Sequence, residues 1–116
     1  MAQRVEETSI DVLDKLHEDL GIPVSDITSG LRLTDQDIER WRENEGEPEH
    51  ISNRLSVLVQ LRDGLYDLFA GPSDVQKWMR SELRYLHWQT PRQVIREGNA
   101  ERVYAAFEAL ASGIFL

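Results

Sequence analysis

The chain has 116 residues, enough for one globular domain with a small addition but too few for two complete domains. It is 41% hydrophobic, which is sufficient for a core, and it has no cysteine, which excludes disulfide frameworks, cysteine-ligated zinc and thiol catalysis. The net charge of −8 is uneven, with −9 over residues 1–50 and +1 over residues 51–116, and an acidic first half argues against non-specific binding of nucleic acid.

The first 31 residues are predicted to form two short helices, because apolar side chains recur there every three or four positions. The first helix begins after Thr8 or Ser9 and ends at Gly21. Its apolar face consists of Val12, Leu13, Leu16 and Leu20. The second helix spans residues 24–29 and is predicted to close at Gly30.

A third short helix is predicted after Thr34, where Asp37 is the acidic partner in a capping box. Ile38 and Trp41 form its inward face. The segment Glu43–His50 that follows has no strongly apolar side chain and is the one linker that the sequence indicates.

A long helix is predicted from about Ile51 to Phe69. Its apolar stripe consists of Ile51, Leu55, Leu58, Leu61, Leu65 and Leu68. Such a stripe fits either the core of one chain or the contact of a structural homo-oligomer, and the sequence leaves both possibilities open.

Three further helices complete the chain. The break at Gly71-Pro72 ends the long helix, and Ser73 is predicted to cap the next. Thr90-Pro91 gives a strong start signal, with Gln93 completing a second capping box. The last helix lies within residues 99–113. No segment alternates with period two, so the fold class is predicted to be all-α.

Residues suited to catalysis are sparse. The three histidines fall in different segments, and no nucleophile elbow or dinucleotide fingerprint is present. His50 lies beside Glu47 and Glu49, but a solvated acidic loop is favoured over a metal site. We therefore predict a protein that is not an enzyme and needs no cofactor or metal. The polar N-terminus, unlike a signal peptide, and the lack of cysteine favour a cytoplasmic location without membrane contact.

The three short helices match the spacing of a helix-turn-helix. The exposed face of the third would present Gln36, Arg40 and Arg42, side chains that read bases or phosphates. Asp35, Asp37 and Glu39 on the same helix have the wrong charge for contact with phosphates. A helical bundle that binds no DNA is favoured, and a DNA-binding regulator remains the alternative.

The last three residues, Ile114, Phe115 and Leu116, are apolar, whereas chain ends are usually polar. They either fold back onto the preceding helix or serve as an anchor in a partner's pocket, with the carboxylate of Leu116 innermost. Gly113 would let the chain turn away from that helix.

Residues 78–116 resemble the toxin-binding domain of the Xre/MbcA/ParS antitoxin family. The residues that carry this resemblance are Trp78, Leu83, Leu86, Thr90-Pro91, the Val94–Gly98 run, Arg102-Val103 and Gly113-Ile114-Phe115. The first half resembles the family's Xre-like helix-turn-helix through Leu20-Gly21, Ile27 and the Ile38–Trp41 run. The acidic third helix and the Glu43–His50 linker depart from the family pattern.

The resemblance implies the antitoxin of a type II toxin–antitoxin pair. Family members neutralise RES-domain toxins, which degrade NAD⁺, and their C-terminal end blocks the toxin's active site. The implied toxin-binding residues are Arg102, Gly113, Ile114, Phe115 and Leu116. The family's N-terminal domain often binds the promoter of its own operon, so operator DNA is a second possible partner, contacted by Gln36, Arg40 and Arg42.

The expected organisation has two parts. Residues 1–50 would form the Xre-like helix-turn-helix region with its acidic linker, and residues 51–116 the long helix with the toxin-binding domain. The expected assembly is a homodimer or a hetero-oligomer with the RES-domain toxin.

Overall fold

The structure is a computed structural model that describes residues 9–43 and 45–113. Within these two ranges every regular element is a helix, and the sole pairing of strand type is an isolated bridge between Leu83 and Gln89. The predicted all-α fold class is therefore confirmed. None of these helices is both long and apolar enough to cross a bilayer.

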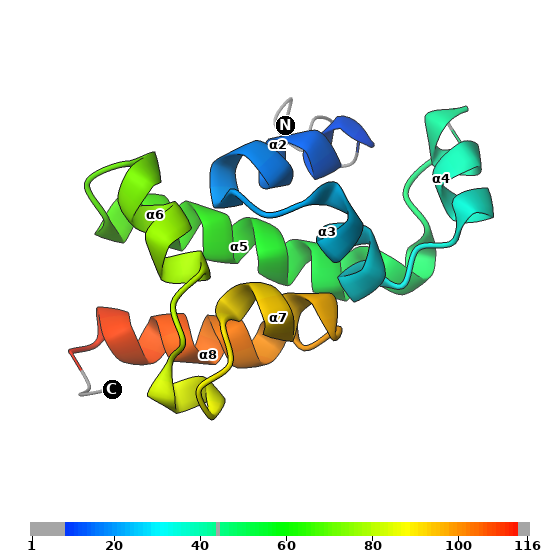
Figure 1. Ribbon diagram of the computed structural model, residues 1–116. Coiled ribbons are helices and arrows are strands. Elements are labelled where there is room, and N and C mark those ends of the chain that lie inside the picture. The colour runs from blue at the N-terminus through cyan, green and yellow to red at the C-terminus, as the bar shows by residue number, and fades with distance from the viewer. Residues whose placement is uncertain (1–8, 44, 114–116) are drawn as a thin grey trace.

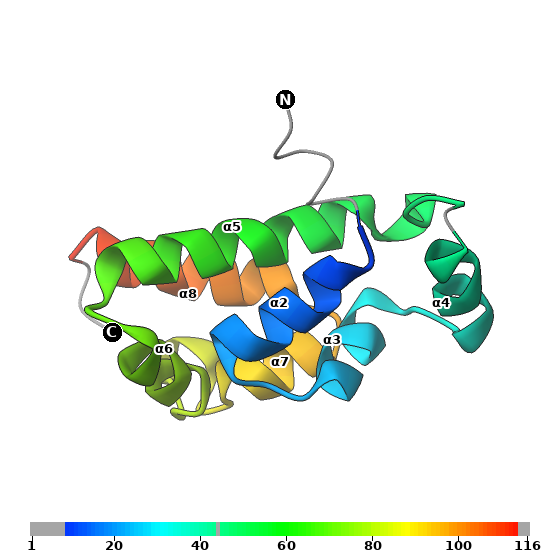
Figure 2. The same cartoon turned by 90° about the horizontal axis from the view of Figure 1, so that it is seen from above.

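Helix α5 (Ser52–Leu68) is the longest element, and the others are arranged around it (Figure 1). Helix α8 (Ala100–Ala111) runs beside α5, and α2 (Asp11–Leu20) crosses them on another side (Figure 2). The remaining helices of this body are α3 (Val24–Leu31), α6 (Pro72–Met79) and α7 (Pro91–Arg96). Helix α4 (Asp35–Arg42) stands apart at one end of the molecule.

The apolar stripe of α5 is buried over most of its length. Four leucines lie in the core: Leu55, Leu58, Leu61 and Leu65. Ile51, also buried, belongs to the short 3-10 helix η1 (Glu49–Ile51) that precedes α5. The assignment of Leu68 to the stripe is wrong, since this side chain is 42% exposed. The helix ends there, and the extended residue Phe69 packs against the core instead.

Gly30 does not end α3, contrary to the sequence-based prediction. The helix continues to Leu31, and Arg32 takes the left-handed conformation at φ 60°. Gly30 is buried inside the helix, where an added Cβ would lie 2.1 Å from the carbonyl oxygen of Ile95 on α7. The glycine is therefore required because α3 and α7 pack closely.

Local start and stop signals account for several other helix ends. Both predicted capping boxes are present: Thr34 pairs with Asp37 at α4, and Thr90 pairs with Gln93 at α7. Gly21 ends α2 in the left-handed region at φ 69°. The prediction that Ser73 caps α6 is wrong, because the helix begins at Pro72. Proline needs no N–H partner at a first helical position.

The two halves of the chain share one hydrophobic core, which includes Leu16 and Ile27 from the first half and Leu61 and Val103 from the second. Polar contacts add to this packing, because the Tyr66 hydroxyl on α5 donates to the carbonyl oxygen of Asp19 on α2 at 2.6 Å. The division of the chain near residue 50 stays a prediction, and the core itself is continuous across it.

Candidate partner-binding surface

Residues 83–89 form a closed loop around the 3-10 helix η2 (Arg84–Leu86), here called the η2 hairpin. The N–H of Leu83 donates to the carbonyl oxygen of Gln89 at 3.1 Å. The N–H of Trp88 donates to the carbonyl oxygen of Leu83 at 2.8 Å. The Leu86 side chain is fully buried beneath the loop. The hairpin is thus fixed by its own backbone and by one apolar anchor.

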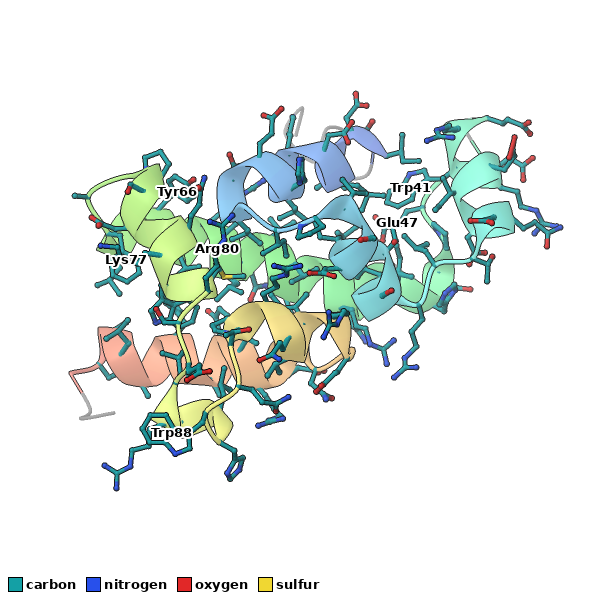
Figure 3. All side chains as sticks on the ribbon, viewed as in Figure 1. Trp41, Glu47, Tyr66, Lys77, Arg80 and Trp88 are labelled. Carbon is teal, nitrogen blue, oxygen red and sulfur yellow. The ribbon has the colours of Figure 1, made fainter. Side chains whose placement is uncertain are left out.

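Two exposed aromatic side chains project from this fixed loop. Trp88 is 63% exposed and Tyr85 is 47% exposed, and Figure 3 shows the Trp88 ring extending away from the body of the molecule. His87 and Trp88 both have left-handed backbones, at φ 57° and 69°. This conformation costs a non-glycine residue roughly 1–2 kcal/mol, and such strain concentrates at functional positions.

A groove of about 620 Å³ lies between the η2 hairpin and α8. Tyr85 forms one wall, and the α8 wall includes Tyr104, Phe107, Glu108 and Ser112. We call it the α8 groove. Its lining side chains are mainly aromatic and aliphatic, with a single carboxylate at Glu108, and both polar and apolar atoms face it, so it suits a partner segment that offers both kinds of group.

Contact between α5 and α8 positions the aromatic wall of this groove. An added Cβ at Gly64 would lie 2.5 Å from the Phe107 ring, so the glycine allows that ring to lie against α5. The Tyr104 and Phe107 rings pack with their centroids 5.7 Å apart at an interplanar angle of 47°. Phe107 is buried and Tyr104 half-buried, which leaves the tyrosine ring at the edge of the groove.

Two of the predicted toxin-binding residues, Arg102 and Gly113, lie within the described residues, and they are far apart. Arg102 is half-buried on the first turn of α8, and Gly113 follows the end of this helix. The rise of an α-helix places them about 16 Å apart, and Arg102 does not line the α8 groove. Gly113 has φ 78°, as expected for a glycine that ends a helix. Ile114, Phe115 and Leu116 lie outside the described residues.

The predicted DNA-binding residues all lie on α4. Gln36, Arg40 and Arg42 are exposed, and so are the acidic residues Asp35 and Glu39. Trp41 is the buried residue of this helix, and it points from α4 toward the body of the molecule (Figure 3). The surface of α4 is therefore of mixed charge.

One of the acidic groups at the start of α4 is stabilised in its charged form. The N–H of Thr34 donates to a carboxylate oxygen of Asp37 at 3.0 Å, and this hydrogen bond lowers the pKa of Asp37 below its usual value. Asp37 is therefore negative at neutral pH. A negative charge at this position opposes the approach of a phosphate backbone.

Sequence reasoning missed Tyr85 and Trp88. Tryptophan is usually buried, and the pattern gives no reason to expect two consecutive non-glycine residues in the left-handed region. The signal that could have found Tyr85 was its place between two core-facing leucines, the half-buried Leu83 and the buried Leu86. Across residues 9–43 and 45–113, no group of three His, Asp or Glu side chains is placed to hold a metal ion.

The family described as the antitoxin Xre/MbcA/ParS C-terminal toxin-binding domain matches residues 64–113. This range contains the η2 hairpin and all of the α8 groove. Among known proteins, the mycobacterial cidal antitoxin MbcA of Mycobacterium tuberculosis is 28% identical over 101 residues, covering 85% of this chain and 88% of MbcA. The antitoxin Xre of Yersinia enterocolitica is 28% identical over 111 residues, covering 92% of this chain and 74% of its own.

A solved structure shares the fold. A chain in the crystal structure of the M. tuberculosis MbcT–MbcA toxin–antitoxin complex superposes with a TM-score of 0.62 at 24% sequence identity. The match covers 91% of this chain and 96% of that one. The MbcT–MbcA crystal structure therefore contains a chain with the same overall arrangement of helices.

Proposed function

We propose that this chain is an antitoxin of the Xre/MbcA/ParS type, whose toxin-binding domain it resembles over residues 64–113, and that it binds and neutralises an NAD⁺-degrading RES-domain toxin. The observation that carries the proposal is the exposed, backbone-fixed aromatic pair of the η2 hairpin beside the α8 groove, inside the matched domain. Tryptophan and tyrosine dominate the energetics of many protein interfaces. A rigid loop that exposes both loses little conformational entropy on binding.

Two parts of the surface would have different tasks. The η2 hairpin and the α8 groove would provide affinity, because they offer apolar area that is already in place. Residues 114–116 would enter the toxin's active site and exclude NAD⁺, as the family resemblance implies. Arg102 would contact the toxin separately, since it lies at the far end of α8 from Gly113.

Co-expression with the product of the neighbouring gene tests the proposal. A tagged form of this chain should co-purify with that protein, and the complex should leave NAD⁺ intact while the free partner consumes it. A neighbouring protein that neither binds this chain nor degrades NAD⁺ would contradict the proposal.

Substitution of Trp88 tests which surface binds. Trp88→Asn removes the ring, and asparagine tolerates the left-handed backbone at this position. We expect affinity for the toxin to fall by about thirtyfold, corresponding to roughly 2 kcal/mol for an interface tryptophan. Leu68→Asn is the matched control, because Leu68 is also exposed but lies outside the hairpin and the groove. Equal affinities for the two variants would remove the hairpin from the interface.

A further inference from the structure

A second hollow, of about 450 Å³, lies at the foot of the η2 hairpin. Arg80 and Glu82 precede the hairpin in the chain, and Thr90, Arg92 and Arg96 follow it. We call this the arginine hollow. The same seven-residue loop that presents Tyr85 and Trp88 therefore has guanidinium groups on both sides of its stem.

Two of these guanidinium groups are held in place by the first half of the chain. Arg92 Nε donates to a carboxylate oxygen of Asp26 at 2.6 Å, and Asp26 is 5% exposed. Arg80 Nη2 donates to the carbonyl oxygen of Gly21 at 3.0 Å. Each guanidinium has five N–H donors and uses one in these contacts, so the rest remain for a ligand. Fixed guanidiniums bind planar oxyanions at a low entropic cost.

The positive charge extends beyond this hollow. Arg80 also lines an adjacent depression of about 760 Å³ together with Lys77, and Figure 3 shows both side chains coming from the region of α6. Arg96 and Lys77 are exposed, and neither side chain has an acidic partner in the described part of the chain. Four cations and one acid, Glu82, line the two depressions of a chain whose net charge is −8.

We propose that Lys77, Arg80, Arg92 and Arg96 bind Asp and Glu side chains of the same partner protein that covers the η2 hairpin. This inference rests on the proposed function. Its basis is proximity in the chain, because the arginines flank the stem of the same loop that carries Trp88. A carboxylate forms short bidentate contacts with arginine. A long polyanion such as DNA is disfavoured, since it would also meet the −9 charge of residues 1–50.

The test is the rate at which the full chain associates with the co-purified toxin, measured at several salt concentrations. The variant is Lys77→Glu with Arg96→Glu, two exposed positions whose side chains form no hydrogen bond or ion pair with the described residues. The matched control is Arg40→Glu with Arg42→Glu on α4, which makes the same change in net charge outside residues 64–113. Melting temperatures show whether each variant folds.

We expect the Lys77/Arg96 variant to associate about tenfold more slowly at low salt, with the difference shrinking at high salt, because surface charges act mainly on the association rate. The control should change far less. Equal rates and equal salt dependence for the two variants would overturn the inference while leaving toxin binding intact. Loss of binding to a duplex oligonucleotide, with toxin association unchanged, would overturn it in favour of DNA. If the wild-type chain binds no toxin, it is the proposed function that fails.

Discussion

At the scale of single residues, Gly30 shows how a missing side chain sets the distance between two helices. The sequence marks this glycine as a helix end, because glycine usually disrupts a helix. In the structure it is buried within α3, facing the carbonyl oxygen of Ile95. A sequence cannot distinguish a glycine that ends a helix from one that allows close packing, since the difference depends on a partner 65 positions away.

Gly30→Ala should therefore destabilise the protein, even though alanine favours helix formation by about 1 kcal/mol. The added methyl group would lie 2.1 Å from a backbone oxygen that has little freedom to move. We expect a net loss of about 1–3 kcal/mol, as for other overpacked sites, measured by denaturant unfolding. Gly71→Ala is the control, since nothing lies within 4 Å of its added Cβ. Equal midpoints for the two variants would show that α3 and α7 can separate without cost.

Tyr66 links stability to alkaline pH. Burial raises the pKa of its hydroxyl above the ordinary value near 10, and the hydroxyl donates to the carbonyl oxygen of Asp19. A raised folded-state pKa means that the stabilisation is complete below the unfolded pKa and is lost as the pH rises through the folded pKa. Tyr66→Phe should cost about 1 kcal/mol at neutral pH and flatten the decline in melting temperature above about pH 10. Parallel pH profiles for the two proteins would contradict this.

At the scale of elements, the sequence correctly predicts the features that depend on residues close together in the chain. The capping boxes at Thr34 and Thr90, and the buried face of α2, depend on neighbouring residues and are confirmed. The η2 hairpin could not be predicted, because its shape depends on the buried Leu86 and on backbone bonds that hold Trp88 in an unfavourable conformation. For the candidate site, the sequence thus indicated the domain but not its exposed aromatic pair.

Helix α4 is the element for which binding to DNA can be tested. Its arginines, Arg40 and Arg42, are exposed, but three carboxylates share the helix. We expect weak binding to a promoter fragment, reduced further by Arg40→Ala with Arg42→Ala. Asp35→Lys with Glu39→Lys should strengthen binding and steepen its salt dependence, because each new phosphate contact releases counterions. Fluorescence anisotropy at several salt concentrations measures both effects. Tight specific binding that survives loss of both arginines would favour a DNA-binding regulator over an antitoxin as the function of this chain.

At the scale of the whole molecule, the shared core joins the first half of the chain to the matched domain. Helices α2 and α3 pack against α5, α6 and α7, so they support the elements that carry the candidate surface. Arg80 and Arg92 are both held by residues of the first half, Gly21 and Asp26. The acidic first half thus holds two of the cations of the proposed binding surface in place.

Removal of residues 114–116 separates binding from inhibition. If these residues block the toxin's active site, the chain ending at Gly113 should keep its helicity and melting temperature, because the core includes Val103 and Phe107 and is formed before that point. It should still bind the toxin through the η2 hairpin and the α8 groove, yet no longer protect NAD⁺. If the three residues instead pack on α8, stability should fall by several kcal/mol, about the cost of losing a buried phenylalanine, and inhibition would fail through unfolding. Full inhibition by a folded, truncated chain would exclude both roles, and the exposed face of α8 would then be the part that blocks the toxin.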